Sequence, residues 1–103
     1  MGYEYRLLLS DSIDSLERIC KVVASGGDWE LIPSSLEIDA PAVGVQTSQS
    51  SGNPEWPHVA DLVHEGPQRI YALCHTQTGV EFVKALKAFL EVMDLWVVVS
   101  DDV

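Results

Sequence analysis

The chain has 103 residues and a formal net charge of −10, because 16 aspartates and glutamates face only 6 lysines and arginines. Its hydrophobic content of 47% excludes a disordered acidic tail, so the charge must lie on the surface of a folded body. Such a field repels nucleic acid and anionic membranes and attracts basic proteins. The length predicts a single domain over residues 1–103.

The sequence also indicates a cytoplasmic setting. Its first residues lack the basic and apolar regions of a usual signal peptide, and no stretch approaches the ~18 apolar residues of a membrane span. Cys20 and Cys74 are expected to be free, buried thiols, although a disulfide between them stays open. Free thiols fit a reducing compartment.

Alternating apolar residues predict a first strand over Tyr3–Ser10. A helix should follow, with Ser10, Asp11 and Ser12 as capping residues, an apolar stripe from Ile13 to Val23, and Gly26-Gly27 as its end. Asp28–Asp39 is expected to form a broken or edge strand, because Pro33 has no amide to donate to a ladder. Ala42–Thr47 reads as another short strand, and a polar loop follows over residues 48–54.

The segment His58–His64 fits either a helix or a strand. The turn residues at 65–68 and the evident strand Arg69–His75 favour a hairpin, and therefore a strand. Thr78 and Glu81 are spaced as a capping box, which predicts a helix whose apolar stripe runs from Phe82 to Met93. Leu95–Ser100 is the last predicted strand.

This order of elements predicts an α+β fold. The expected architecture is a ferredoxin-like sandwich, with a mostly antiparallel sheet of about five or six strands and both helices on one face.

No pattern of catalytic residues stands out. The chain has no nucleophile elbow, phosphate loop or dinucleotide fingerprint. His58 and His64 are spaced too far apart to hold one ion together, and Cys74 and His75 should point to opposite faces of a strand. We therefore expect no enzyme activity, no metal and no cofactor.

Several acids have no evident structural duty, and these are the candidate partner-binding residues. The Asp28–Asp39 segment pairs its carboxylates two residues apart, and tryptophan beside acid in a loop has the composition of an interaction hot spot. Trp29 is assigned to the core and Trp96 to a structural role. The candidate site comprises Asp28, Glu30, Glu37, Asp39, Glu55 and Trp56.

The whole-chain pattern resembles small, acidic α+β bacterial immunity proteins of polymorphic toxin systems. The resemblance rests on Tyr3-Glu4-Tyr5-Arg6, a proline-bounded entry into His58-Val59, Ile70–Cys74 before a capped helix, and the closing Val97–Asp102. It implies a non-enzymatic protein that neutralises a basic toxin domain, such as a nuclease, with no nucleic acid or membrane partner. The alternative is a dimeric regulatory or small-ligand-binding ferredoxin-like module, joined through strand edges or a sheet face.

Overall fold

The computed structural model describes residues 3–34, 36, 39–47 and 58–100. Within them the elements form an α+β arrangement, in which four consecutive strands separate the two helices. The elements are β1 (Tyr3–Leu9), α1 (Leu16–Ser25), β2 (Trp29–Pro33), β3 (Ala42–Thr47), β4 (Ala60–Gly66), β5 (Arg69–Cys74), α2 (Gln77–Val92) and β6 (Val97–Ser100).

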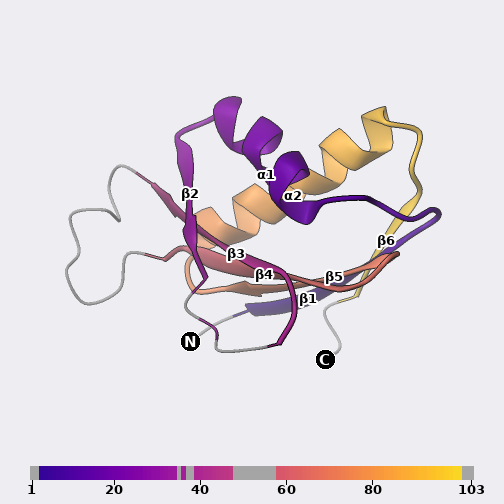
Figure 1. The fold of residues 1–103 in the computed structure, drawn as a ribbon. Helices are drawn as coiled ribbons and strands as arrows, with labels where there is room; N and C mark the ends of the chain where they lie inside the picture. The colour runs from indigo at the N-terminus through magenta and orange to yellow at the C-terminus, as the bar shows by residue number, and fades with distance from the viewer. Residues whose placement is uncertain (1–2, 35, 37–38, 48–57, 101–103) are drawn as a thin grey trace.

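The six strands of the described residues form one antiparallel sheet in the order β2-β3-β4-β5-β1-β6. Both helices lie on the same face of this sheet, above it in Figure 1. α1 packs over β2 and β3, α2 packs over β4, β5 and β6, and the two helices touch each other. The predicted antiparallel α+β sheet with two helices on one face is therefore confirmed.

The core lies between the sheet and the helices. Successive side chains of a strand point to opposite faces, so every second residue of each central strand faces the helices. Leu7 of β1 and Ile70 of β5 are fully buried there, against Phe82 and Leu86 of α2. The alternation predicted for the first strand thus produces the core directly.

Both helices begin at residues other than those the sequence indicated. Ser15, and not Ser10, Asp11 or Ser12, caps α1, and its hydroxyl accepts from the Arg18 amide. Ser10 is instead held against the entrance to β6, where its amide donates to the Trp96 carbonyl and its hydroxyl accepts from the Trp96 amide. Because the Ser10 hydroxyl and amide are hydrogen-bonded to Trp96, Ser10 does not cap α1.

The capping box predicted at Thr78 and Glu81 is also wrong. Thr76, the last extended residue after β5, caps α2 and accepts from the Gly79 amide, so Thr78 lies inside the helix. Gly79 sits against the Val59 carbonyl, and a side chain there would collide with it. The first turn of α2 therefore passes close to the chain entering β4.

From Ala60 onwards the ambiguous segment 58–64 is a strand, as the hairpin argument favoured. β4 extends through Gly66 and pairs with β5 around a turn at Pro67 and Gln68, with a bulge between His64 and Gly66. The expected edge strand in Asp28–Asp39 is β2, which ends at Pro33 on the outer side of β3. The predicted strand Ala42–Thr47 is β3. Residues 48–54 lie outside the described part of the chain.

The sheet face away from the helices carries polar and charged side chains over β1, β4 and β5. The Tyr71 hydroxyl donates to Glu4 at 2.6 Å. The Arg6 guanidinium lies 5.5 Å from the centre of the Tyr71 ring and pairs with Glu65 at 3.4 Å. Because these side chains are polar and bonded to one another, the middle of this face can be exposed to water without a further layer of structure over it.

One carboxylate on this face, that of Asp61, is fully buried. Ser34 donates its hydroxyl to Oδ1 at 2.8 Å, and Nε2 of His75 lies 2.8 Å from Oδ2. Ser34 follows β2, so the chain must cross β3 to reach Asp61 on β4. It crosses at Gly44, where an added Cβ would lie only 2.8 Å from the Pro33 carbonyl oxygen. The buried carboxylate thus anchors the segment after β2 to the sheet.

Removing the Ser34 hydroxyl should destabilise the protein. Ser34→Ala leaves one oxygen of a buried carboxylate without this donor, and hydrogen bonds to charged groups contribute about 1.5–3 kcal/mol. Urea denaturation should show a loss of that size in the free energy of unfolding. Ser25→Ala, which removes an exposed hydroxyl bonded to the Val22 carbonyl, is the control and should change it by less than about 0.5 kcal/mol. Equal effects of both variants would contradict the anchoring role.

Tyr71 should ionise late in an alkaline titration. Burial, followed by the hydrogen bond to Glu4 and its charge, raises the pKa of Tyr71 from 10.0 to about 12. Between these values the unfolded chain loses the phenol proton while the folded chain keeps it, so stability should fall as pH rises through this window. Absorbance titration should show a late phenolate signal whose amplitude falls in Tyr71→Phe and is retained in the exposed-site control Tyr3→Phe. An unchanged late amplitude in Tyr71→Phe would refute the assignment.

Candidate functional site

The predicted partner-binding acids are only partly within the described residues. Asp28, just before β2, Glu30 on β2 and Asp39 are all exposed. The Glu30 carboxylate accepts from the side-chain amide of Gln46 on β3 at 2.9 Å. Glu37, Glu55 and Trp56 lie outside the described residues. The assignment of these six residues to a partner surface stays a prediction.

Two tryptophans have contrasting surroundings. Trp29 packs edge-on against Phe82 with ring centres 5.2 Å apart, which confirms its assignment to the core. Trp96 was expected to be structural, yet 80% of it is exposed. The structural expectation for Trp96 is therefore wrong, because its side chain points away from the helices.

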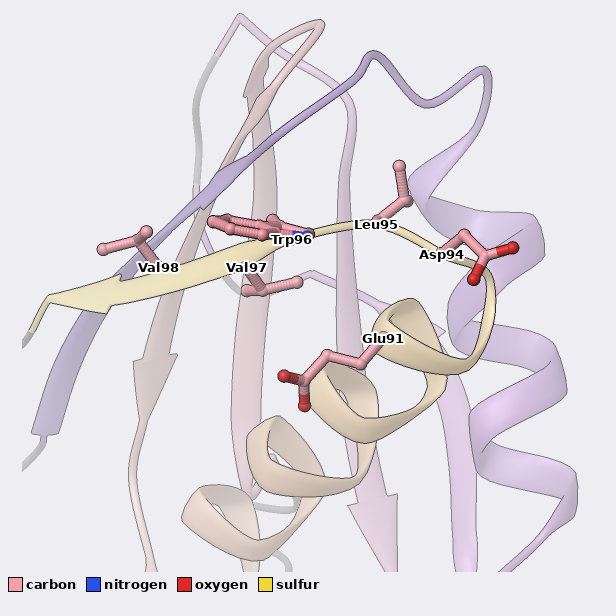
Figure 2. A pocket seen from close by; sticks show the side chains of 6 residues that line it. All are labelled: Glu91, Asp94, Leu95, Trp96, Val97 and Val98. Atoms are coloured by element: carbon pink, nitrogen blue, oxygen red, sulfur yellow. The ribbon is translucent and has the colours of Figure 1, made fainter.

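A groove of about 400 Å³ runs beside β6, and we call it the β6 groove. Figure 2 shows that β6 and the end of α2 border it, with the Glu91 side chain reaching from the helix towards the strand and Trp96 on the opposite side of the strand. The lining residues are Glu91, Asp94, Leu95, Trp96, Val97 and Val98. The groove thus combines carboxylates, an indole ring and aliphatic side chains.

A tight turn between α2 and β6 shapes the groove. Asp94 adopts a left-handed backbone with φ 66°, which aspartate tolerates better than most residues. The Leu95 amide then donates to the Leu90 carbonyl, and Leu95 packs against the core. Because neighbouring residues of an extended chain point to opposite faces, the burial of Leu95 turns Trp96 outwards.

The exposed indole belongs to a larger apolar patch, comprising Leu8, Trp96 and Val98. Val98 pairs directly with Leu8 across the β1–β6 ladder, and Trp96 lies two residues earlier on the same face. Val98 is 59% exposed and Leu8 43% exposed. Single exposed apolar residues are ordinary, but a contiguous group beside an aromatic ring is typical of an interaction site.

The carboxylates of the β6 groove are accessible to a cation. Asp94 is exposed and has no ion-pair partner among the described residues. Glu91 pairs with Lys87 one helical turn earlier, at 3.2 Å. Such exposed pairs contribute only about 0.3–0.5 kcal/mol, so a cation from a partner could replace Lys87.

Sequence reasoning missed this site for a definable reason. Residues 95–99 are all apolar, so the strand shows no alternation that would separate its buried side from its exposed side. A central strand of this composition would be covered on both faces, whereas β6 lies at the end of the described sheet. The sequence did contain one indication of an interaction site here, because Asp94 lies two residues before Trp96. The combination of an acid and a nearby tryptophan is the one that made Trp56 a candidate.

The two thiols are buried, and the imidazoles of His58 and His75 make structural contacts, whereas the buried Nε2 of His64 has no hydrogen-bond partner among the described residues. Cys20 and Cys74 are both free and buried, and burial raises the pKa of each thiol from 9.0 to about 12. Cys74 faces the core while His75 pairs with Asp61 on the other face, as strand geometry predicted. His58 Nε2 lies 2.8 Å from the Pro33 carbonyl oxygen. Among the described residues, no three metal-ligating side chains of His, Cys, Asp or Glu come together.

Comparison with known proteins adds no family. No family model matches the chain, and neither a curated protein nor a solved structure matches it. In the described residues, neither helix has the length and apolar character needed to cross a membrane. Inference about function therefore rests on the geometry of the described surface.

The cysteines should resist modification in the folded protein. A pKa of about 12 keeps each thiol protonated at neutral pH, and only the thiolate reacts readily with disulfide reagents. Titration with a chromogenic disulfide at pH 8 should show little release from the native protein and two equivalents after denaturation in urea. Rapid native release would indicate an activated thiol and would revive a cysteine-dependent enzyme.

Proposed function

We propose that the protein is a non-enzymatic binding protein that neutralises a basic protein partner, in the manner of the small acidic immunity proteins it resembles. The partner would be a toxin domain, such as a nuclease. The observation that carries the proposal is the exposed Trp96 beside the carboxylates of Glu91 and Asp94. This combination places an aromatic anchor on one side of β6 and negative charge on the other.

The apolar patch supports a protein partner. An indole that is 80% exposed forgoes the free energy it would gain by burial, which is about 25 cal/mol for each Å² of apolar area. Tryptophan is among the residues that most often dominate binding free energy at interfaces. A partner that covers Trp96 and Val98 would recover this contribution.

The net charge supports the choice of a basic partner. A net charge of −10 accelerates encounter with a cationic protein, and accessible carboxylates beside the patch can pair with its lysines and arginines. The same field opposes binding to nucleic acid. The acids predicted from the sequence, of which Asp28, Glu30 and Asp39 are exposed, would contribute to steering even where they make no contact.

The thiols support a non-enzymatic role. A cysteine nucleophile needs a lowered pKa, whereas burial raises the pKa of both Cys20 and Cys74. Both thiols are free, which also favours a reducing, cytoplasmic setting.

We also infer that the fold is a ferredoxin-like sandwich extended at one side. The part formed by β6, β1, β5 and β4, with α1 and α2 as connections, follows the βαββαβ plan if β2 and β3 are an insertion after α1. The insertion carries Glu30 and lengthens the sheet away from the β6 groove.

Capture from the source cells tests the function. Tagged protein should retain a small basic protein at low salt and release it as salt rises, because screening weakens the attraction. Expression of the retained protein alone should be toxic, and co-expression of this chain should relieve the toxicity. Retention of no basic protein, or a stable homodimer with a small ligand that raises its melting temperature, would overturn the proposal in favour of the dimeric module.

Charge reversal in the β6 groove should weaken binding of the retained protein. Glu91→Lys should slow association and flatten its salt dependence, while Trp96→Ala should weaken affinity by about 30-fold or more, mainly through faster dissociation. The matched control is Glu81→Lys, the same change at an exposed position near the other end of α2. Surface plasmon resonance at several salt concentrations measures each rate. Equal effects of Glu91→Lys and Glu81→Lys would show that only net charge matters.

A further inference from the structure

The outward-facing backbone groups of β6 follow from its pairing with β1. The Ser10 amide donates to the Trp96 carbonyl, so this pair is a hydrogen-bonded one. The Leu9 amide turns the other way and donates to the Gln68 carbonyl. Hydrogen-bonded and non-hydrogen-bonded pairs alternate along an antiparallel ladder. The Leu9–Val97 and Leu7–Val99 pairs are therefore non-hydrogen-bonded, and the amides and carbonyls of Val97 and Val99 point away from β1.

The two edges of the described sheet differ in their protection. β2 ends in Pro33, which has no amide to offer, and the segment after it is tied down through Ser34. β6 has neither proline nor lysine over Val97–Ser100, and no bulge interrupts its pairing with β1. Natural proteins usually block an exposed edge with one of these devices, because a bare edge recruits another strand. Among the described residues no strand pairs with the outer edge of β6, and this edge also borders the β6 groove.

We propose that β6 binds its partner by strand addition: an extended, cationic segment of the partner lies along the β6 groove and pairs with the backbone of Val97 and Val99. This inference rests on the proposed function and specifies how the basic partner is held. Main-chain hydrogen bonds would supply register, while the indole of Trp96 and the carboxylates of Glu91 and Asp94 would select the side chains.

Charge decides between a basic partner and a second copy of this chain. Pairing β6 with β6 would join two bodies that each carry a net charge of −10, and would add a second set of groove carboxylates to the same interface. Like charges across an interface oppose association. A segment with lysine or arginine instead meets Asp94, which is exposed, and Glu91, which is held only by an exposed pair with Lys87. The cationic segment is the occupant that the groove favours.

The test uses the full chain and a defined probe. The probe is an acetylated, amidated peptide of alternating lysine and valine, about six residues long, which is a typical strand length. A matched peptide has glutamate in place of lysine. Amide hydrogen exchange by NMR should show fast exchange of Val97 and Val99 in the free protein. The lysine peptide should slow both, while Val98, whose amide faces β1, should change little. The glutamate peptide should have no effect.

A backbone substitution provides the second arm. Val99→Pro removes one outward amide without removing a hydrogen bond to β1, since proline is tolerated on an edge strand where its nitrogen faces outwards. Val99→Ala keeps the amide and is the control. Affinity for the lysine peptide should fall about tenfold in Val99→Pro relative to Val99→Ala, which corresponds to the loss of one hydrogen bond. A thermal melt of each variant reports whether the fold is retained, and the exchange measurement on the unmodified chain stands if Val99→Pro does not fold.

The outcomes separate this inference from the function on which it rests. A lysine peptide that binds without slowing exchange at Val97 and Val99, and with equal affinity for both variants, would overturn strand addition and leave the basic partner in place. Binding of the glutamate peptide with equal affinity would overturn selection by charge. A stable dimer by light scattering with Val97 and Val99 protected would assign the edge to a second copy. Failure of the lysine peptide to bind, while the captured basic protein still binds, would also refute the extended-segment mode; failure of both would refute the function itself.

Discussion

The helices cover only one face of the sheet, and the rest of the structure follows from that constraint. A strand in such a sheet can bury only every second residue, so the other face and both edges must be made compatible with water or with another molecule. The chain meets this demand differently across the sheet. Near β4 it folds its own segment back onto the buried Asp61. Over β1 and β5 it places Glu4 and Arg6 against Tyr71. At β6 it does neither.

The anchoring at Asp61 shows that covering part of the open face requires several residues from different parts of the chain. A buried carboxylate needs hydrogen-bond donors, and it obtains them from Ser34, which lies two strands away in the sheet, and from His75 at the end of β5. The crossing also requires Gly44, because a side chain there would meet the Pro33 carbonyl. Three separate parts of the sequence are thus committed to closing one side of the face.

Local sequence patterns predicted the elements well, because amphipathic spacing acts within each element. The strand from Tyr3 and the stripe of α2 were evident on this basis, whereas the hairpin of β4 and β5 was favoured by its turn residues. The features that local patterns did not predict depend on contacts between residues that are far apart in the sequence. Ser10 fails to cap α1 because it pairs with Trp96, and Asp61 is buried because Ser34 reaches it. Trp96 is exposed because it lies on the face of the sheet that the helices leave uncovered, which no spacing in residues 95–100 could reveal.

Net charge and local geometry have different consequences for recognition. The acids are spread along the chain, so the field of −10 favours any cationic protein and discriminates poorly among them. Discrimination requires contacts that only one shape can make, and the described surface offers these where Trp96, the groove carboxylates and the outward amides of β6 meet. In an interface of this kind the net negative charge of the protein would raise the rate of association. The edge of β6 would fix the register in which the partner's segment pairs with it. The acidic composition thus favours a class of partner, and the uncovered edge favours the way in which that partner is held.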